Sequence, residues 1–141
     1  MIRRLLVDTG VWYAMFARRD GHRDRVVSIV DNIERANTLI VPWPTMYETL
    51  RTRFVKDDEG LTSFVEYIDH ANIDFIDSRP YDEQALSSTR DWAFNKKRPM
   101  SMVDCLIRQV IEDRNAAVDA LATLDHRDFQ DVCAQYGVVL L

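Results

Sequence analysis

The stretch RLLVD at residues 4–8 is a short aliphatic run that ends abruptly at a charged residue. Runs of this length and composition are typical of strands buried on both faces of a parallel sheet. The same kind of run recurs along the chain. The later examples are TLIV (38–41), IDFI (73–76), DALAT (119–123) and VVLL (138–141). The sequence therefore predicts five strands.

Helical periodicity fills the segments between these runs. Apolar residues recur at i, i+3, i+4 and i+7, which is the pattern of an amphipathic helix with one buried face. The clearest examples are RDRVVSIVDNIE (23–34), GLTSFVEYID (60–69) and SMVDCLIRQVIE (101–112). Two further helices are predicted near residues 44–57 and 80–94. Helices alternate with strands throughout.

Strands separated by crossover helices form a parallel sheet covered by helices on both faces. The predicted fold is therefore an α/β domain of three layers (α/β/α) around a five-stranded parallel sheet. A chain of 141 residues with 47% hydrophobic and 29% charged residues is large enough to bury one proper core. We expect residues 1–141 to form a single domain.

The cysteines and the apolar runs indicate a reducing, aqueous environment. Cys105 and Cys133 show no spacing typical of a zinc site or of a disulfide-rich secreted protein, so we expect both to be core thiols. The apolar run Leu5–Val7 is too short for a signal peptide, and no other run could span a bilayer. The sequence predicts a cytoplasmic protein with no membrane partner.

The net charge of −5 argues against a protein that holds nucleic acid by bulk positive charge. Basic residues nevertheless occur in local groups, which by themselves are typical of solvated surfaces. The groups are Arg3 with Arg4, Arg18 with Arg19, Arg23 with Arg25, Arg51 with Arg53, and NKKR at 95–98.

Acidic residues follow or precede the predicted strands in a way that brings four of them to one edge of the sheet. Asp8 and Asp125 directly follow strands, and ligands of open α/β sheets bind beyond the carboxyl ends of the strands. Glu48 and Asp104 lie in the first turns of predicted helices that begin at the same edge. The sequence therefore predicts a convergence of carboxylates that are far apart along the chain.

Each of these acids also has an ordinary structural explanation. The spacings Thr45 to Glu48 and Ser101 to Asp104 fit a capping box, in which an acid in the first helical turn satisfies free backbone amides. Asp8 and Asp125 could likewise be turn or capping residues.

Glu48 fits a surface cap best, because it lies off the apolar stripe of Met46, Tyr47, Leu50 and Phe54. Asp104 is harder to explain in this way because it shares a helix face with Ile107 and Ile111.

Four carboxylates packed together repel one another unless cations lie between them. Oxygen ligands without histidine or cysteine favour Mg²⁺ or Mn²⁺. The three histidines, His22, His70 and His126, are not placed by any motif as a general base, and surface or capping roles are expected for them. The predicted site is therefore a divalent metal centre built from acids alone.

Four motifs together resemble the PIN-domain nucleases, most closely the VapC-type toxins of bacterial toxin–antitoxin pairs. They are LLVDTGVWYA (5–14), PTMYETLRTR (44–53), SMVDCLI (101–107) and ALATLDHRDF (120–129). The resemblance implies a metal-dependent endoribonuclease. It also implies an RNA substrate, a cognate antitoxin protein and a homodimer.

The resemblance assigns Asp8, Glu48, Asp104 and Asp125 as the catalytic acids, and we expect Asp8 and Asp104 to be the direct metal ligands. Thr9 matches the hydroxyl residue that usually follows the first acid. Gly10 departs from the pattern, because the family more often has Ser or Asn there, and a side-chain hydrogen bond would be missing. The fourth acid could be Asp125 or Asp128, which otherwise would be a plain charge at a helix start. The position of TLD after the strand favours Asp125.

Three alternatives remain at the level of sequence. A phosphatase of the haloacid dehalogenase type also has an aspartate after its first strand, but its DxDxT motif would need an acid where Gly10 stands. A non-enzymatic receiver module would need adjacent acids after the first strand and a lysine after the last. A pseudo-nuclease that only binds is the third alternative, although all four acids are present.

Overall fold

The computed structural model describes residues 1–17, 21–51 and 53–141, and it places the side chains of all of these except residues 23 and 53. The described part of the chain forms a five-stranded parallel sheet with the strand order β3-β2-β1-β4-β5. The strands are β1 (Arg4–Val7), β2 (Thr38–Pro42), β3 (Ile73–Ile76), β4 (Ala120–Ala122) and β5 (Val139–Leu140). Each strand coincides with one of the predicted runs.

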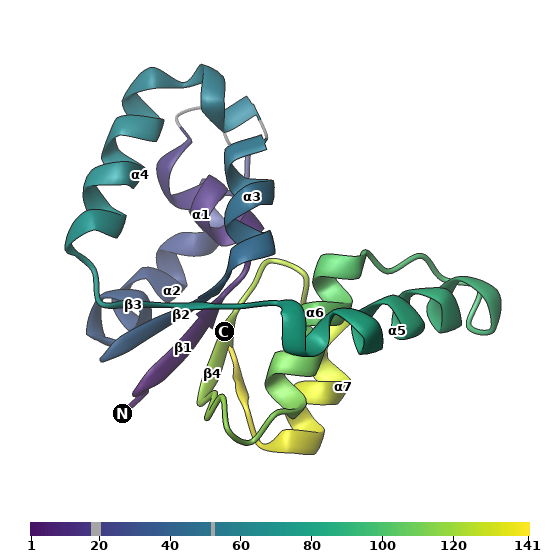
Figure 1. The fold of residues 1–141 in the computed structure, drawn as a ribbon. Helices are drawn as coiled ribbons and strands as arrows, with labels where there is room; N and C mark the ends of the chain where they lie inside the picture. Colours follow the sequence, from purple (N-terminus) through teal and green to yellow (C-terminus); the bar gives the residue numbers. More distant parts are fainter. Residues whose placement is uncertain (18–20, 52) are drawn as a thin grey trace.

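The helices cover both faces of this sheet. They are α1 (Thr9–Phe16), α2 (Arg23–Arg35), α3 (Trp43–Arg51), α4 (Asp58–His70), α5 (Asp82–Phe94), α6 (Met102–Glu112) and α7 (His126–Tyr136). Two short 3-10 helices, η1 (Arg53–Lys56) and η2 (Arg79–Tyr81), precede α4 and α5. Helices α1 to α4 lie on one face and α5 to α7 on the other, which confirms the predicted three-layer α/β/α fold (Figure 1).

The central strand explains why two separate cores form. Leu5 and Val7 face the core of α1 to α4, whereas Leu6 faces the core of α5 to α7, and none of the three is exposed. A strand buried on both faces needs apolar residues at every position. Aromatic residues fill the first core, where Trp12 meets the edge of Phe64 with ring centroids 5.6 Å apart.

Two helices were missed by the sequence reasoning. Helix α1 is apolar almost throughout, so it shows no clear helical stripe against a polar face. Helix α7 does carry a stripe of buried Phe129, Val132 and Cys133, and it ends at Gly137 in the left-handed conformation (φ 69°). These features could have identified α7 from sequence.

The helix predicted near residues 44–57 is wrong in its extent and in its buried face. It consists of α3 followed by the separate 3-10 helix η1. Met46 and Phe54 are buried as predicted, but Tyr47 is 67% exposed and Leu50 is 40% exposed. The apolar pattern at these positions is typical of a buried surface, but the described residues leave Tyr47 and Leu50 exposed.

Two further predictions can be compared with the structure. Cys105 and Cys133 are both buried free thiols, as expected. No helix in the described ranges is long and apolar enough to cross a membrane.

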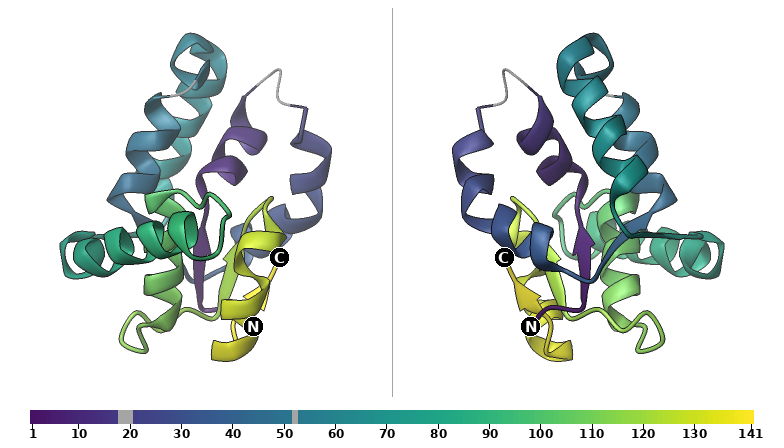
Figure 2. Two further views of the ribbon diagram at one scale, coloured as in Figure 1. Left: turned by 90° about the vertical axis from the view of Figure 1, so that its right-hand side faces the viewer. Right: turned by 90° about the vertical axis from the view of Figure 1, so that its left-hand side faces the viewer.

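Helix α5 and the loop that follows it project from the body of the molecule (Figures 1 and 2).

The strand order identifies one edge of the sheet as the place for a ligand. From β1 the chain proceeds to β2 and β3 on one side, and β4 and β5 lie on the other. Ligands of open α/β sheets bind at such a reversal, beyond the carboxyl ends of the strands. Asp8 directly follows β1, and Asp125 lies three residues after the end of β4.

Candidate active site

Asp8 occupies the centre of this edge and is held by two hydrogen bonds. The Thr9 backbone N–H donates to one carboxylate oxygen at 2.7 Å, and the buried Thr123 hydroxyl donates to the other at 2.8 Å. Burial raises the pKa of Asp8 to about 6, and the charges of Asp104 and Glu48 add to that rise against the lowering effect of the two hydrogen bonds. Asp8 is therefore an oriented carboxylate, and among the described residues no cationic side chain balances its charge.

Two threonines connect Asp8 to the neighbouring acids. The Thr9 hydroxyl donates to a Glu48 carboxylate oxygen at 3.0 Å, which links α1 to α3. The Thr123 hydroxyl, which donates to Asp8, also accepts from the Asp125 backbone N–H at 3.1 Å. The sequence reasoning missed Thr123. Its position at the end of a strand, two residues before Asp125, is the signal that could have identified it.

Glu48 is not a surface cap. The Thr45 hydroxyl is buried and has no hydrogen-bond partner among the described groups, so the capping box predicted for this pair does not form. The Glu48 carboxylate instead points to Thr9, and its charge contributes to the raised pKa of Asp8. The structure thus places Glu48 with Asp8.

Asp104 contacts the N-cap of its own helix and also interacts electrostatically with the other acids. Its backbone N–H donates to the Ser101 hydroxyl at 3.0 Å, and that hydroxyl donates back to the Asp104 carboxylate at 2.7 Å. The carboxylate is nevertheless close enough to Asp8 to raise its pKa. Burial, together with the charge of Asp125, raises the pKa of Asp104 as well.

Asp125 and Asp128 differ sharply in their surroundings. Asp125 is exposed at the N-cap of α7 but makes no capping hydrogen bond with its side chain, and its charge acts on Asp104. Asp128 is 8% exposed and forms an ion pair with Arg98. Geometry therefore groups Asp125 with the other acids, whereas Asp128 belongs to the packing between α7 and the loop after α5.

The four carboxylates influence one another in a series. The charges of Glu48 and Asp104 raise the pKa of Asp8, and the charge of Asp125 raises the pKa of Asp104. Carboxylates without arginine or lysine partners are donors that suit a hard divalent cation. Among the described residues, no three His, Cys, Asp or Glu side chains are already arranged to hold a metal ion. The donor chemistry fits Mg²⁺ or Mn²⁺.

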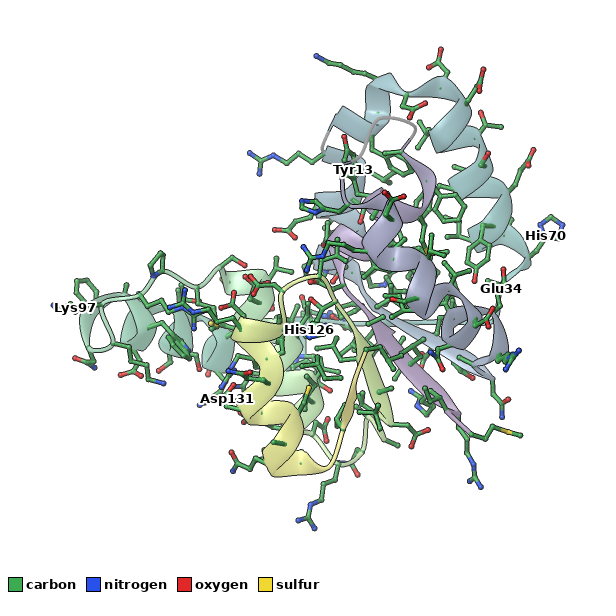
Figure 3. The ribbon with its side chains drawn as sticks, turned by 180° about the vertical axis from the view of Figure 1, so that it is seen from behind. Tyr13, Glu34, His70, Lys97, His126 and Asp131 are labelled. Carbon is green, nitrogen blue, oxygen red and sulfur yellow. The ribbon has the colours of Figure 1, made fainter. Side chains whose placement is uncertain are left out.

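Histidines and most basic groups lie outside this cluster. His126 contacts the Leu141 carbonyl through Nε2 at 3.0 Å, and His70 contacts the Glu66 carbonyl through Nδ1 at 2.7 Å. In the NKKR segment, Lys96 lies 3.9 Å from the centroid of the Trp92 ring, while Lys97 lies at the far tip of its loop (Figure 3). Arg18 and Arg19, and the side chains of Arg23 and Arg53, lie outside the described residues.

Comparison with known families identifies the family to which the chain belongs. A family model for the PIN domain matches residues 5–135, a range that includes all four acids. The chain belongs to the PIN domain family. This membership replaces the phosphatase and receiver alternatives. No curated protein sequence matches this PIN domain.

Solved structures share its architecture at low sequence identity. VapC20 of Mycobacterium tuberculosis, a toxin that cleaves the sarcin–ricin loop, is 13% identical with a TM-score of 0.68 over 90% of this PIN domain and 94% of that chain. VapBC2 of Rickettsia felis, solved with a DNA fragment from its promoter, is 14% identical with a TM-score of 0.58 over 98% of this chain and 97% of that chain. These similarities concern the fold.

Proposed function

We propose that this PIN domain is a Mg²⁺- or Mn²⁺-dependent endoribonuclease that acts as the toxin of a type II toxin–antitoxin pair. The observation that carries the proposal is the Asp8 carboxylate, which is oriented by two hydrogen bonds and lies within the fields of Asp104 and Glu48. Family membership and the fold shared with VapC20, a toxin that cleaves the sarcin–ricin loop, support it.

In this proposal Asp8 and Asp104 hold the cation, and Glu48 and Asp125 complete the acidic shell. A divalent ion held there would activate a water molecule and neutralise charge that develops on the phosphoryl oxygens. Thr9 and Thr123 fix the orientation of Asp8, and Ser101 fixes that of Asp104. Orientation of this kind matters because partners of metal ligands determine how well the ligands are placed.

The decisive experiment measures RNA cleavage by purified protein with Mg²⁺, with Mn²⁺ and with excess EDTA. We expect cleavage only with metal. Asp104→Asn should reduce the rate by about a hundredfold or more, because even outer-shell partners of a metal site contribute about 10- to 100-fold. The matched control is Asp58→Asn, which removes an exposed acid from the first turn of α4.

Full activity in excess EDTA, or in Asp104→Asn, would refute the metal mechanism. Absence of cleavage by the wild-type protein with either metal would favour the binding-only alternative. Equal losses in Asp58→Asn and Asp104→Asn would assign the effect of Asp104 to helix capping.

The proposed antitoxin covers the acidic edge. Its chemistry follows from the site, because an arginine side chain matches carboxylates through two parallel hydrogen bonds and could replace the metal. The fold shared with VapBC2 supports a partner of this kind. Co-expression with the product of the adjacent gene should suppress both RNA cleavage and growth arrest. Unchanged cleavage and arrest would contradict the pairing.

We also propose a homodimer, which the exposed face of α3 supports. Trp43 stacks on Phe75 with ring centroids 4.4 Å apart and on Tyr47 at 6.3 Å, and Leu50 continues this face one turn further. Contiguous exposed apolar groups of this kind mark interaction surfaces. Tyr47→Arg should convert the dimer to a monomer in light scattering. Val27→Arg, at a similarly exposed position on α2, is the control and should leave the mass unchanged.

A further inference from the structure

We infer that Arg25 binds a phosphate group of the RNA strand at the Asp125 side of the acidic edge, an assignment that rests on the proposed nuclease function. Arg25 lies in the first turn of α2, but its Nη2 donates to the Leu124 carbonyl oxygen at 2.8 Å across 99 positions of sequence. Leu124 immediately precedes Asp125. The guanidinium group is thereby fixed beside the turn that carries the fourth acid.

Among the described residues, no partner of Arg25 neutralises its positive charge. Its contacts are a backbone carbonyl and the Nδ1 atom of His22, which lies 3.5 Å from Nη1. Other arginines are paired with carboxylates, as Arg98 is with Asp128 and Arg108 with Asp131. Within residues 1–17, 21–51 and 53–141, Arg25 forms no ion pair. A full cation therefore stands at the rim of an acidic site.

The chemistry of the guanidinium group suits a phosphate in this position. Arginine carries five N–H donors in a planar fork, so two contacts leave donors available for phosphate oxygens. The side chain is exposed, and the Leu124 carbonyl restricts its orientation before any ligand arrives. Acids at the edge and a net charge of −5 repel a polyanion, so a cation beside them would offset the repulsion where the strand enters.

The test measures binding of a fluorescein-labelled oligouridine to the Asp104→Asn variant in EDTA, where we expect no cleavage, over a series of salt concentrations. Each phosphate contact with a single strand contributes about 0.7 to the slope of log affinity against log salt. We expect Arg25→Gln to reduce the slope by about 0.7 and to weaken binding at low salt by about tenfold. Arg25→Lys should retain the slope, because it retains the charge.

The matched control is Arg35→Gln, which removes the same charge from the other end of α2, where Arg35 is exposed and lies near Asp31. It should leave the slope unchanged. The inference is wrong if Arg25→Gln and Arg35→Gln shift the slope equally, if neither shifts it, or if Arg25→Gln weakens only the complex with the antitoxin. Circular dichroism and melting temperature verify that each variant is folded.

Cleavage assays separate this inference from the proposed function. If the wild-type protein cleaves RNA with Mn²⁺ while Arg25→Gln leaves the salt slope unchanged, only the assignment of Arg25 fails. If the wild-type protein does not cleave RNA but the slope depends on Arg25, the nuclease proposal fails and the phosphate contact stands.

Discussion

Asp131 in the middle of α7 and Asp8 at the end of β1 show how differently one side-chain type behaves in the same fold. Burial and neighbouring acids raise the pKa of Asp8 to about 6, whereas hydrogen bonds from Arg108 lower the pKa of Asp131 to about 2. Arg108 donates to both carboxylate oxygens of Asp131 at 2.7 Å. Figure 3 shows Asp131 on α7, on the outer side of that helix.

The difference between the two regions lies in the partner. At the Arg108–Asp131 pair a cation stabilises the ionised carboxylate, so the acid strengthens the folded state. At Asp8 burial and the neighbouring acids penalise ionisation in the folded state, and the hydrogen bonds from the Thr9 amide and the Thr123 hydroxyl offset only part of that penalty. A group of carboxylates that the protein itself does not neutralise is the arrangement expected of a site for an external cation.

The largest expected effect that would test the difference between Asp8 and Asp131 is in the pH dependence of folding stability. The folded-state pKa of Asp8, about 6, lies above its ordinary value of 3.8, so stability should be lost as pH rises between these values. The free energy of unfolding should fall by about 3 kcal/mol at most, because each pH unit between the folded and the ordinary pKa contributes about 1.4 kcal/mol. Denaturant unfolding in EDTA should show that Asp8→Asn removes much of it. Parallel pH curves for the two proteins would contradict the raised pKa.

A second test uses metal at constant pH. Mn²⁺ at a hundredfold excess over its dissociation constant should stabilise the wild-type protein by about 2.7 kcal/mol, because it binds only the folded state. Asp104→Asn should be as stable as wild type or more so without metal near neutral pH, and should gain less from Mn²⁺. If metal shifts both melting curves equally, or if the variant is less stable throughout, Asp104 is a capping residue and not a ligand.

A third test separates Asp125 from Asp128, which lie three residues apart. Asp125→Asn should lower RNA cleavage by about 10- to 100-fold with little change in stability, because its exposed side chain makes no capping bond. Asp128→Asn should leave cleavage nearly unchanged but lower stability by about 1–3 kcal/mol, because Arg98 loses a buried ionised partner. The reverse outcome would make Asp128 the fourth acid.

The smallest expected effect is at Asp131. Its pKa is lowered, so its contribution to stability is present above pH 3.8 and is lost as pH falls toward about 2, the opposite direction from Asp8. Because Asp131 is 60% exposed, solvent screening should keep the effect of Asp131→Asn below about 1 kcal/mol at neutral pH. Acid unfolding monitored by circular dichroism would detect it. A larger loss than in Asp128→Asn would reverse the expected ranking.

Much of the fold and part of the site could be predicted from the sequence, because the relevant information is local. A strand buried on both faces must be apolar at each buried position, so LLV at 5–7 and ALA at 120–122 can be recognised from sequence. Once these strands are parallel, Asp8 and Asp125 must approach the same edge. The N-cap that Ser101 provides for α6 is equally local, since its hydroxyl accepts from the Asp104 backbone N–H three residues away.

Sequence by itself therefore predicted the five strands, most of the helices apart from α1 and α7, and the group of acids at the edge of the sheet. Only the tertiary structure decided which carboxylates are neutralised and which are not, because that depends on side chains from distant segments. Thr123 reaches Asp8 across 115 positions, and Arg98 reaches Asp128 across 30. The exposure of Tyr47 was also decided at this level, because periodicity marks a face as apolar but does not specify what covers it.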